Sequence, residues 1–242
     1  MPPKPVCLIT TLKTRFMKQT VNVAFALMGV LFCVFLTLAN ILEVKIVSAG
    51  PLTMTAGLIV FPLSYIINDC VAEVWGYRKA RLLIWTGFAA NFIAVAFIQL
   101  AIWLPAAPVW TQQEAFASLF GMTPRIVAAS FAAFLVGSFI NAYVMSRMKI
   151  ASQGRHFSLR AIVSTLLGEG ADSVIFFPLA FGGILPFDTL VAMILTQTVL
   201  KSLYEIIALP LTVRVVRWVK RCSGADVYDE GVSYNVFKIG NM

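Results

Sequence analysis

Charged residues are scarce in this sequence. Aspartate, glutamate, lysine and arginine make up 12% of its 242 residues, whereas 60% are hydrophobic and the mean hydropathy is +0.86. Soluble domains usually have about 25% charged and about 45 to 50% apolar residues. The composition therefore excludes an ordinary soluble domain and predicts an integral membrane protein.

Histidine and cysteine are also rare. The one histidine, His156, lies in a basic loop, and the four cysteines show no CxxC spacing. We therefore expect no metal site, no cofactor and no structural disulfide. No histidine partner exists for a buried serine or cysteine, and Glu169 and Asp172 lie too close on one helix for a protease-like dyad, whose carboxylates normally come from two separate elements. The sequence predicts no catalytic residue, and the protein is not expected to be an enzyme.

Motifs for nucleotides and nucleic acids are missing as well. Without a P-loop, any energy input would come from an ion gradient, a partner protein or trapping of a solute inside the cell. The net charge of +8 arises from basic residues beside apolar segments, where they set the orientation of membrane insertion. Because no basic face with interleaved aromatic residues accompanies them, no nucleic-acid partner is expected.

Long apolar segments predict the fold, since about 20 residues cross the hydrocarbon core of a bilayer. The expected transmembrane helices cover 21–39, 54–75, 82–104, 126–145, 159–182 and 190–213, with an irregular connection over 105–123. The N-terminus, the loops after the second and fourth segments and the C-terminal region hold 16 of the 19 lysines and arginines, so both termini are expected in the cytoplasm. The fold class is therefore all-α, a polytopic six-helix bundle over residues 21–220. A basic cytoplasmic segment (1–20) precedes it, and a polar, poorly ordered cytoplasmic tail (221–242) follows.

The fifth segment carries Glu169 and Asp172 near its middle. Residues three apart share one face of a helix, so the two carboxylates point the same way, with Ser164 and Thr165 one to two turns behind them. Each central charge costs about 2.5 to 3.5 kcal/mol on insertion scales, so this polar stripe is expected to face protein or a water-filled cavity. It is either a solute-binding site or a polar network that fastens helices together.

A further polar stripe is expected on the second predicted segment, 54–75. Tyr65, Asp69 and Glu73 recur every four residues, which predicts either an extension of the cavity toward the inner surface or an ordinary amphipathic helix end.

The sixth segment adds Lys201, Tyr204 and Glu205. Lys201 is expected to neutralise Glu205 one turn away, or Glu169 or Asp172 across an interface. Acid still outnumbers base. Either some carboxylates are protonated, or the cavity keeps a negative potential that suits a cationic or hydrogen-bond-donating solute.

The chemistry of a carboxylate narrows the class of solute. Its two oxygens accept side by side, which matches the paired N–H donors on the edge of a guanine-like heterocycle. The nearby aromatic residues Tyr65, Phe176 and Tyr204 could stack on a planar ring, although each is also compatible with lipid or core packing.

Three motifs resemble the vitamin uptake transporter family, whose bacterial members act as queuosine precursor transporters. They are FPLSYIINDCVAEVWGYRKAR (Phe61 to Arg81), LRAIVSTLLGEGADSVIFF (Leu159 to Phe177) and LKSLYEIIALPLTVRVV (Leu200 to Val216). Together with the six-segment layout and the overall length, the resemblance covers nearly all of the chain outside the two tails.

The resemblance implies a multi-pass protein of the bacterial inner membrane that imports preQ0 and preQ1, the deazaguanine precursors of queuosine. These are planar bases with a guanine-type donor edge, and preQ1 also carries an aminomethyl cation, so an acidic cavity suits both. Carried over by position, the resemblance implies that the binding residues are Asp69, Glu73, Arg160, Ser164, Asp172, Ser173, Lys201, Tyr204 and Glu205. Glu169, where many relatives have glutamine, joins the predicted site because of its place on the polar stripe.

Two functional interpretations from different classes follow. The first is a secondary importer or facilitator with alternating access around an acidic mid-membrane site. The second is a membrane subunit that binds vitamin-like solutes and docks onto a separate energising ATPase complex. Small residues four apart on the first helix are typical of that docking. The first predicted segment has no clean AxxxA pair, and Ala128 with Ala132 and Ala129 with Ala133 occur in the fourth segment instead, which weakens the second interpretation. The expected partners are a small-molecule solute and the lipid bilayer, and a homo-oligomer or an energising partner is compatible with the sequence.

Overall fold

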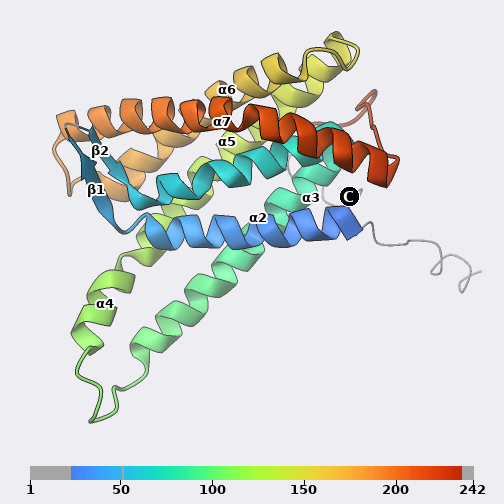
Figure 1. The fold of residues 1–242 in the computed structure, drawn as a ribbon. Coiled ribbons are helices and arrows are strands. Elements are labelled where there is room, and N and C mark those ends of the chain that lie inside the picture. The colour runs from blue at the N-terminus through green and yellow to red at the C-terminus, as the bar shows by residue number, and fades with distance from the viewer. Residues whose placement is uncertain (1–22, 51, 236–242) are drawn as a thin grey trace, which may run out of the picture.

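The computed structural model describes residues 23–50 and 52–235, and the predicted basic segment 1–20 lies outside them. Long helices account for most of the described chain: α2 (Val23–Leu42), α3 (Phe61–Trp103), α5 (Thr123–Ala151), α6 (Phe157–Phe181) and α7 (Phe187–Ser223). The connections contain β1 (Ile46–Ala49), β2 (Leu52–Thr55), the 3₁₀ turn η1 (Ala56–Ile59) and the short helix α4 (Gln113–Gly121). The hairpin β1–β2 lies at one end of α2 and α7, and the segment 224–235 that follows α7 lies at the other end (Figure 1).

Among the described residues, four helical segments are long and apolar enough to cross a membrane. They are Val23–Leu42, Phe61–Trp103, Gln113–Ala151 and Phe157–Phe181. Their outer faces expose large apolar side chains, among them Val30, Phe97 and Val174. Such a perimeter is stable against lipid but not against water. The protein is therefore a mostly helical, multi-pass membrane protein, as the composition predicted.

The second and third predicted segments form one helix, α3, that is broken at Gly76. Its φ of 80° and ψ of 175° lie outside the helical region, and a positive φ of this kind favours glycine. The chain changes direction at this break (Figure 1), so residues 61–75 and 77–103 act as two half-helices. The predicted basic loop beyond Gly76 is helical instead, and Arg81 is buried, where it donates to the backbone carbonyls of Ser233 and Asn235.

Two connections differ from the sequence prediction. The all-helical prediction missed the antiparallel hairpin, in which Ile46 pairs with Thr55 and Ala49 pairs with Leu52. The following helix begins at Phe61 rather than near Met54, with Pro62 in its first turn, where a missing N–H breaks no helical hydrogen bond. The connection 105–123, predicted to be irregular, contains α4.

The C-terminal residues 224–235 pack against the bundle, so the prediction of a poorly ordered tail is wrong for this part. Asp229 is 5% exposed, and its carboxylate accepts hydrogen bonds from the Tyr77 amide at 2.9 and 3.0 Å and from the Ser146 hydroxyl. Tyr77 is the first residue after the break, so its amide has no partner within its own half-helix. Asp229 therefore caps the second half of α3 from a distant part of the chain.

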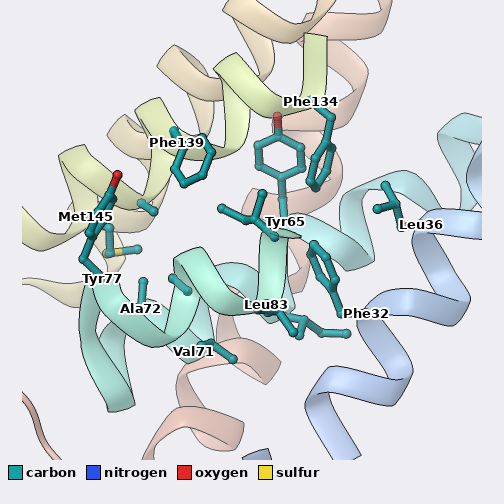
Figure 2. Packing of buried hydrophobic residues seen from close by; sticks show 14 of the residues in the cluster. Phe32, Leu36, Tyr65, Val71, Ala72, Tyr77, Leu83, Phe134, Phe139 and Met145 are labelled. Atoms are coloured by element: carbon teal, nitrogen blue, oxygen red, sulfur yellow. The ribbon is translucent and has the colours of Figure 1, made fainter. Parts of the chain in front are cut away.

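The main apolar core lies between α2, α3 and α5. Figure 2 shows Phe32 and Leu36 of α2 on one side of Tyr65 and Leu83, with Phe134 of α5 nearby. The Phe134 ring meets Tyr65 edge-on at a centroid distance of 5.5 Å. A Cβ atom at Gly87 would overlap the Phe32 ring, so a larger residue there would push α2 away from α3.

Glycines also bring α5 and α6 together. A Cβ atom at Gly137 would lie 2.6 Å from the carbonyl oxygen of Gly168, and one at Gly168 would lie 2.8 Å from that of Gly137. The two helices therefore cross with their backbones in contact, a packing that membrane proteins build from small residues. Because Glu169 follows Gly168 directly, this crossing fixes where the polar stripe of α6 lies.

Candidate functional site

The polar stripe of α6 is buried inside the protein, as predicted. Glu169 is fully buried and Asp172 is 3% exposed. Ser164 and Ser173 on the same helix are also buried, and the Ser164 hydroxyl donates to the carbonyl of Ala161 at 2.9 Å. The stripe therefore faces other helices rather than lipid.

Lys201 of α7 pairs with Asp172 of α6. Its ammonium nitrogen lies 3.2 Å from Asp172 Oδ2 and 3.8 Å from the centre of the Phe61 ring. Lys201 was predicted to pair either with Glu205 on its own helix or with a carboxylate across a helix interface, and the structure shows the second arrangement. The benzene ring stabilises the cation through its negative face, so Lys201 is held by α3 and α6 together.

Asp69 of α3 meets Glu205 of α7. The two buried carboxyl groups lie in hydrogen-bond contact, and the Asn141 amide of α5 donates to Asp69 Oδ1 at 2.6 Å. Asn141 was not predicted as a site residue, although an amide inside an apolar segment was the available signal. Three helices therefore converge on this pair.

Glu169 lies beside both of these pairs without a partner of its own. Neither of its carboxyl oxygens has a hydrogen-bond partner among the residues that the structure describes. The same is true of the Tyr65 hydroxyl and the Asn68 side chain nearby. We call Asp69, Glu169, Asp172, Lys201 and Glu205 the central cluster. Unpartnered buried polar atoms are rare in folded proteins, and they mark a place where a ligand, water or proton completes the bonding.

Glu73 lies one helical turn from Asp69 but belongs to a different set of contacts. Its Oε2 lies 2.6 Å from Arg160 Nη1 and its Oε1 lies 2.7 Å from Lys220 Nζ. Lys149 donates to the Glu73 backbone carbonyl and lies 2.7 Å from Asp226 Oδ1, which Lys220 also approaches at 2.9 Å. We call Glu73, Lys149, Arg160, Lys220 and Asp226 the inner network, after the cytoplasmic side on which the predicted topology puts them.

The structure therefore separates Glu73 and Arg160 from the other predicted site residues, since it pairs them with each other. Lys149, Lys220 and Asp226 were not predicted as partners. Their sequence signal was weak, because each lies in a stretch with several other charges.

Asp226, in the segment after α7, is partly exposed. Although partial burial acts to raise its pKa, hydrogen bonds from Lys149 and Lys220 outweigh that effect and hold the pKa of Asp226 below its ordinary value. Asp226 is therefore ionised at neutral pH, and it joins the C-terminal segment to the inner network.

At the end of the central cluster away from the inner network lie one hydrogen bond between neutral side chains and one buried glutamate. The Gln197 amide of α7 donates to Thr55 Oγ1 of β2 at 2.6 Å, and both residues are fully buried. Glu43, directly after α2, is 4% exposed and packs against Gly57, where a Cβ atom would overlap its carboxyl group. We call Gln197, Thr55 and Glu43 the outer contact, after the side on which the predicted topology puts them. None was predicted as a site residue: Thr55 and Glu43 lie near the ends of predicted segments, and Gln197 lies inside the sixth one.

Tyr204 faces a different place. It is half-buried and lines an apolar cavity of about 650 Å³ between α2, α3 and α7, together with Met28 and Cys70. Tyr204 therefore faces apolar surroundings and points away from the central cluster, unlike the predicted site residues that form that cluster.

The central cluster can bind a solute that brings hydrogen-bond donors. It contains four carboxyl groups and one ammonium group, and the ammonium group is already paired. When Glu169 is ionised, its two unpartnered oxygens can only accept hydrogen bonds, so they suit N–H donors or a cation. No group of three His, Cys, Asp or Glu side chains suited to a metal ion is found among residues 23–50 and 52–235.

Comparisons with known proteins show which proteins this chain is similar to. No solved structure matches the chain. It is 29% identical over 173 residues to a Bacillus subtilis (strain 168) protein named "Probable queuosine precursor transporter", covering 71% of this chain and 76% of that protein. It is also 29% identical over 127 residues to the Escherichia coli (strain K12) protein named "Queuosine precursor transporter", covering 52% of this chain and 55% of that protein.

A family match covers the region that holds the central cluster. The pattern described as "Putative vitamin uptake transporter" matches residues 55–215. This range runs from Thr55 of the outer contact through α3, α5 and α6 and most of α7. Since it spans more than half of the chain, the protein belongs to the vitamin uptake transporter family.

Proposed function

We propose that this protein imports queuosine precursors of the 7-deazaguanine class through the central cluster. The observation that carries the proposal is Glu169, a fully buried carboxyl group with two unpartnered oxygens beside the Asp172–Lys201 pair. The names of the two relatives support this class of solute.

Recognition would rest on the paired donors of a guanine-type edge. Two adjacent N–H groups can reach both oxygens of one carboxylate, which gives orientation as well as affinity. The Phe61 and Tyr65 rings, whose centroids are 5.4 Å apart, lie on the α3 side of the cluster and can pack against a planar base. The aminomethyl cation of preQ1 would interact with the surplus of acid.

The proposed topology has six crossings with both termini in the cytoplasm of a bacterial cell, in its inner membrane. Breaking α3 at Gly76 gives two crossings, of which residues 61–75 make a short one of about 22 Å. Helix α7 crosses as well, because its polar residues Gln197, Lys201 and Glu205 are buried within the protein. In this proposal residues 21–220 form the transporter domain, and the segments before and after it are cytoplasmic.

The two ends of the central cluster would act as alternating gates. The inner network closes the end with Arg160 and Lys220, and the outer contact closes the end near the hairpin. A solute could reach the cluster when one set of contacts opens, and leave when the other does.

The test is the queuosine content of tRNA in cells that cannot synthesise the precursors, supplied with nanomolar preQ0 or preQ1. The gene should restore queuosine. Asp172→Asn, which leaves Lys201 without its anion, should reduce uptake by about 10- to 100-fold because a charge-assisted contact contributes about 1.5 to 3 kcal/mol.

The matched control is Asp188→Asn on the exposed start of α7, which should leave uptake unchanged. Membrane abundance of each variant is measured in parallel. Normal uptake by Asp172→Asn at normal abundance would refute the site, and no restoration by the abundant native protein would refute the solute class.

A further inference from the structure

The contact between Asp69 and Glu205 is chemically incomplete. Asp69 is fully buried and Glu205 is 2% exposed, and they come from different helices. Their carboxyl groups lie in hydrogen-bond contact, yet Asp69 Oδ2 and Glu205 Oε2 face no donor among the described residues. Ionised carboxylates are acceptors only, so such a contact requires a proton on one of the two groups.

No neighbouring cation can replace that proton in this arrangement. Asn141 donates to Asp69 Oδ1 but is neutral, and Lys201 lies on Asp172 at 3.2 Å. The titratable side chains that face the pair are Tyr65 and Cys70 on α3 and Glu169 on α6, and none of these can carry a positive charge. Glu73 is itself neutralised by Arg160 and Lys220.

The position of the pair suits a carrier. Asp69 lies one helical turn from Glu73 of the inner network, and Glu205 lies one turn from Lys201 of the central cluster. The pair also joins α3 to α7, so any motion that separates these helices also separates the two carboxyl groups.

We propose that the Asp69–Glu205 pair carries one proton inward with each solute molecule, so that uptake is driven by a proton gradient. The proton binds from the outer side and forms an O–H bond to one carboxylate, while the other accepts that hydrogen. When the inner side opens, the groups separate in water, the O–H bond breaks, and the proton passes to a cytoplasmic water molecule. On the empty return both carboxylates are ionised, and their mutual repulsion keeps them apart until a proton binds again from the outer side.

This inference rests on the proposed function, and the experiment separates the two. The purified full-length protein is placed in liposomes with the membrane potential clamped at zero, and labelled preQ0 or preQ1 is added with or without a pH gradient. With one proton per solute molecule, an outside pH one unit below the inside should give about tenfold accumulation. A pH dye in the lumen should report acidification that depends on the solute.

Variants of the pair sharpen the result. Asp69→Asn and Glu205→Gln should each lose the response of accumulation to the pH gradient and the lumen acidification. The matched control Glu114→Gln, on the exposed face of α4, should keep both.

Equal solute concentrations on the two sides with and without the gradient would overturn proton coupling but leave the proposed function standing. A pair variant that still accumulates solute and acidifies the lumen would overturn the assignment to this pair. No entry of either precursor under any gradient would overturn the proposed function, and the coupling with it.

Discussion

The inner network and the central cluster are both built on buried carboxyl groups, but they differ in how these groups are partnered. Glu73 has a cation on each oxygen, at 2.6 and 2.7 Å, whereas Glu169 has no partner on either oxygen among the described residues. Burying an uncompensated charge is costly, and folded proteins retain such groups mainly where function requires them. The comparison supports the proposal that the inner network contributes to closure and stability, and that the central cluster is left incomplete for a ligand.

The largest expected effect comes from breaking the inner network with Glu73→Ala. This change leaves Arg160 and Lys220 buried or half-buried without their shared anion. Removal of one partner from a buried ion pair typically destabilises a protein by about 3 to 5 kcal/mol. The measurement is the free energy of unfolding in detergent micelles. Glu114→Ala on exposed α4 is the control, expected to stay within about 0.5 kcal/mol. A loss below about 1 kcal/mol for Glu73→Ala would contradict this view of the network.

A smaller effect is expected from Asp229→Ala, which removes the cap at the break in α3. The Tyr77 amide and the Ser146 hydroxyl would then lose their shared acceptor. An unsatisfied buried donor costs about 1 to 3 kcal/mol, so the unfolding free energy should fall by that amount. Glu230→Ala, at the exposed neighbouring position, should have no measurable effect, and equal losses in the two variants would argue against capping.

In the central cluster, Glu169→Gln should separate binding from stability. No ion pair is lost, so we expect the unfolding free energy to change by less than about 1 kcal/mol. The charge is lost, so uptake of the precursor with the aminomethyl cation should fall more than uptake of the precursor without it. Competition between the two labelled precursors measures this ratio, and an unchanged ratio would mean that Glu169 does not contact the cation.

The smallest expected effect is the pH dependence from Asp226. Its pKa is lowered in the folded protein, so its stabilising contribution is complete above about pH 4, the unfolded value, and is lost as the pH falls through the folded pKa. Because the Asp226 side chain is 47% exposed, solvent screening limits the contribution to less than about 1 kcal/mol. The difference in stability between the native protein and Asp226→Asn should therefore shrink on acidification from about pH 5 to about pH 3. A difference that grows with acidification would reverse the assigned sign.

The sequence predicted the parts of the site that follow from helical periodicity. Glu169 and Asp172 share a buried face because they are three residues apart, and the Asp172–Lys201 pair was among the expected alternatives. Periodicity does not identify which neighbouring helix lies opposite. The family resemblance does not identify it either: it grouped Glu73 and Arg160 with the binding residues, whereas the structure places them in the inner network.

Other features had no periodic signal. The hairpin is too short and apolar to be distinguished from the start of a helix, so its register was missed. The segment 224–235 is held mainly by contacts to backbone groups and by Asp229, which a search for apolar repeats does not detect. Tyr204 adjoins Glu205 in the sequence, but neighbours on a helix point about 100° apart, so it faces the apolar cavity instead.

The Asp229 cap on the Tyr77 amide also has a consequence for the order in which parts of the protein fold during synthesis. The carboxylate that satisfies the Tyr77 amide lies 152 residues further along the chain. At about 5 to 20 residues per second, the ribosome needs roughly 8 to 30 s to make that stretch. Until then the Tyr77 amide at the break in α3 has no cap. Asp229 follows α7, so all the described helices are translated before the cap can form. The angle between these halves is therefore set late, by a segment that is itself outside the helices.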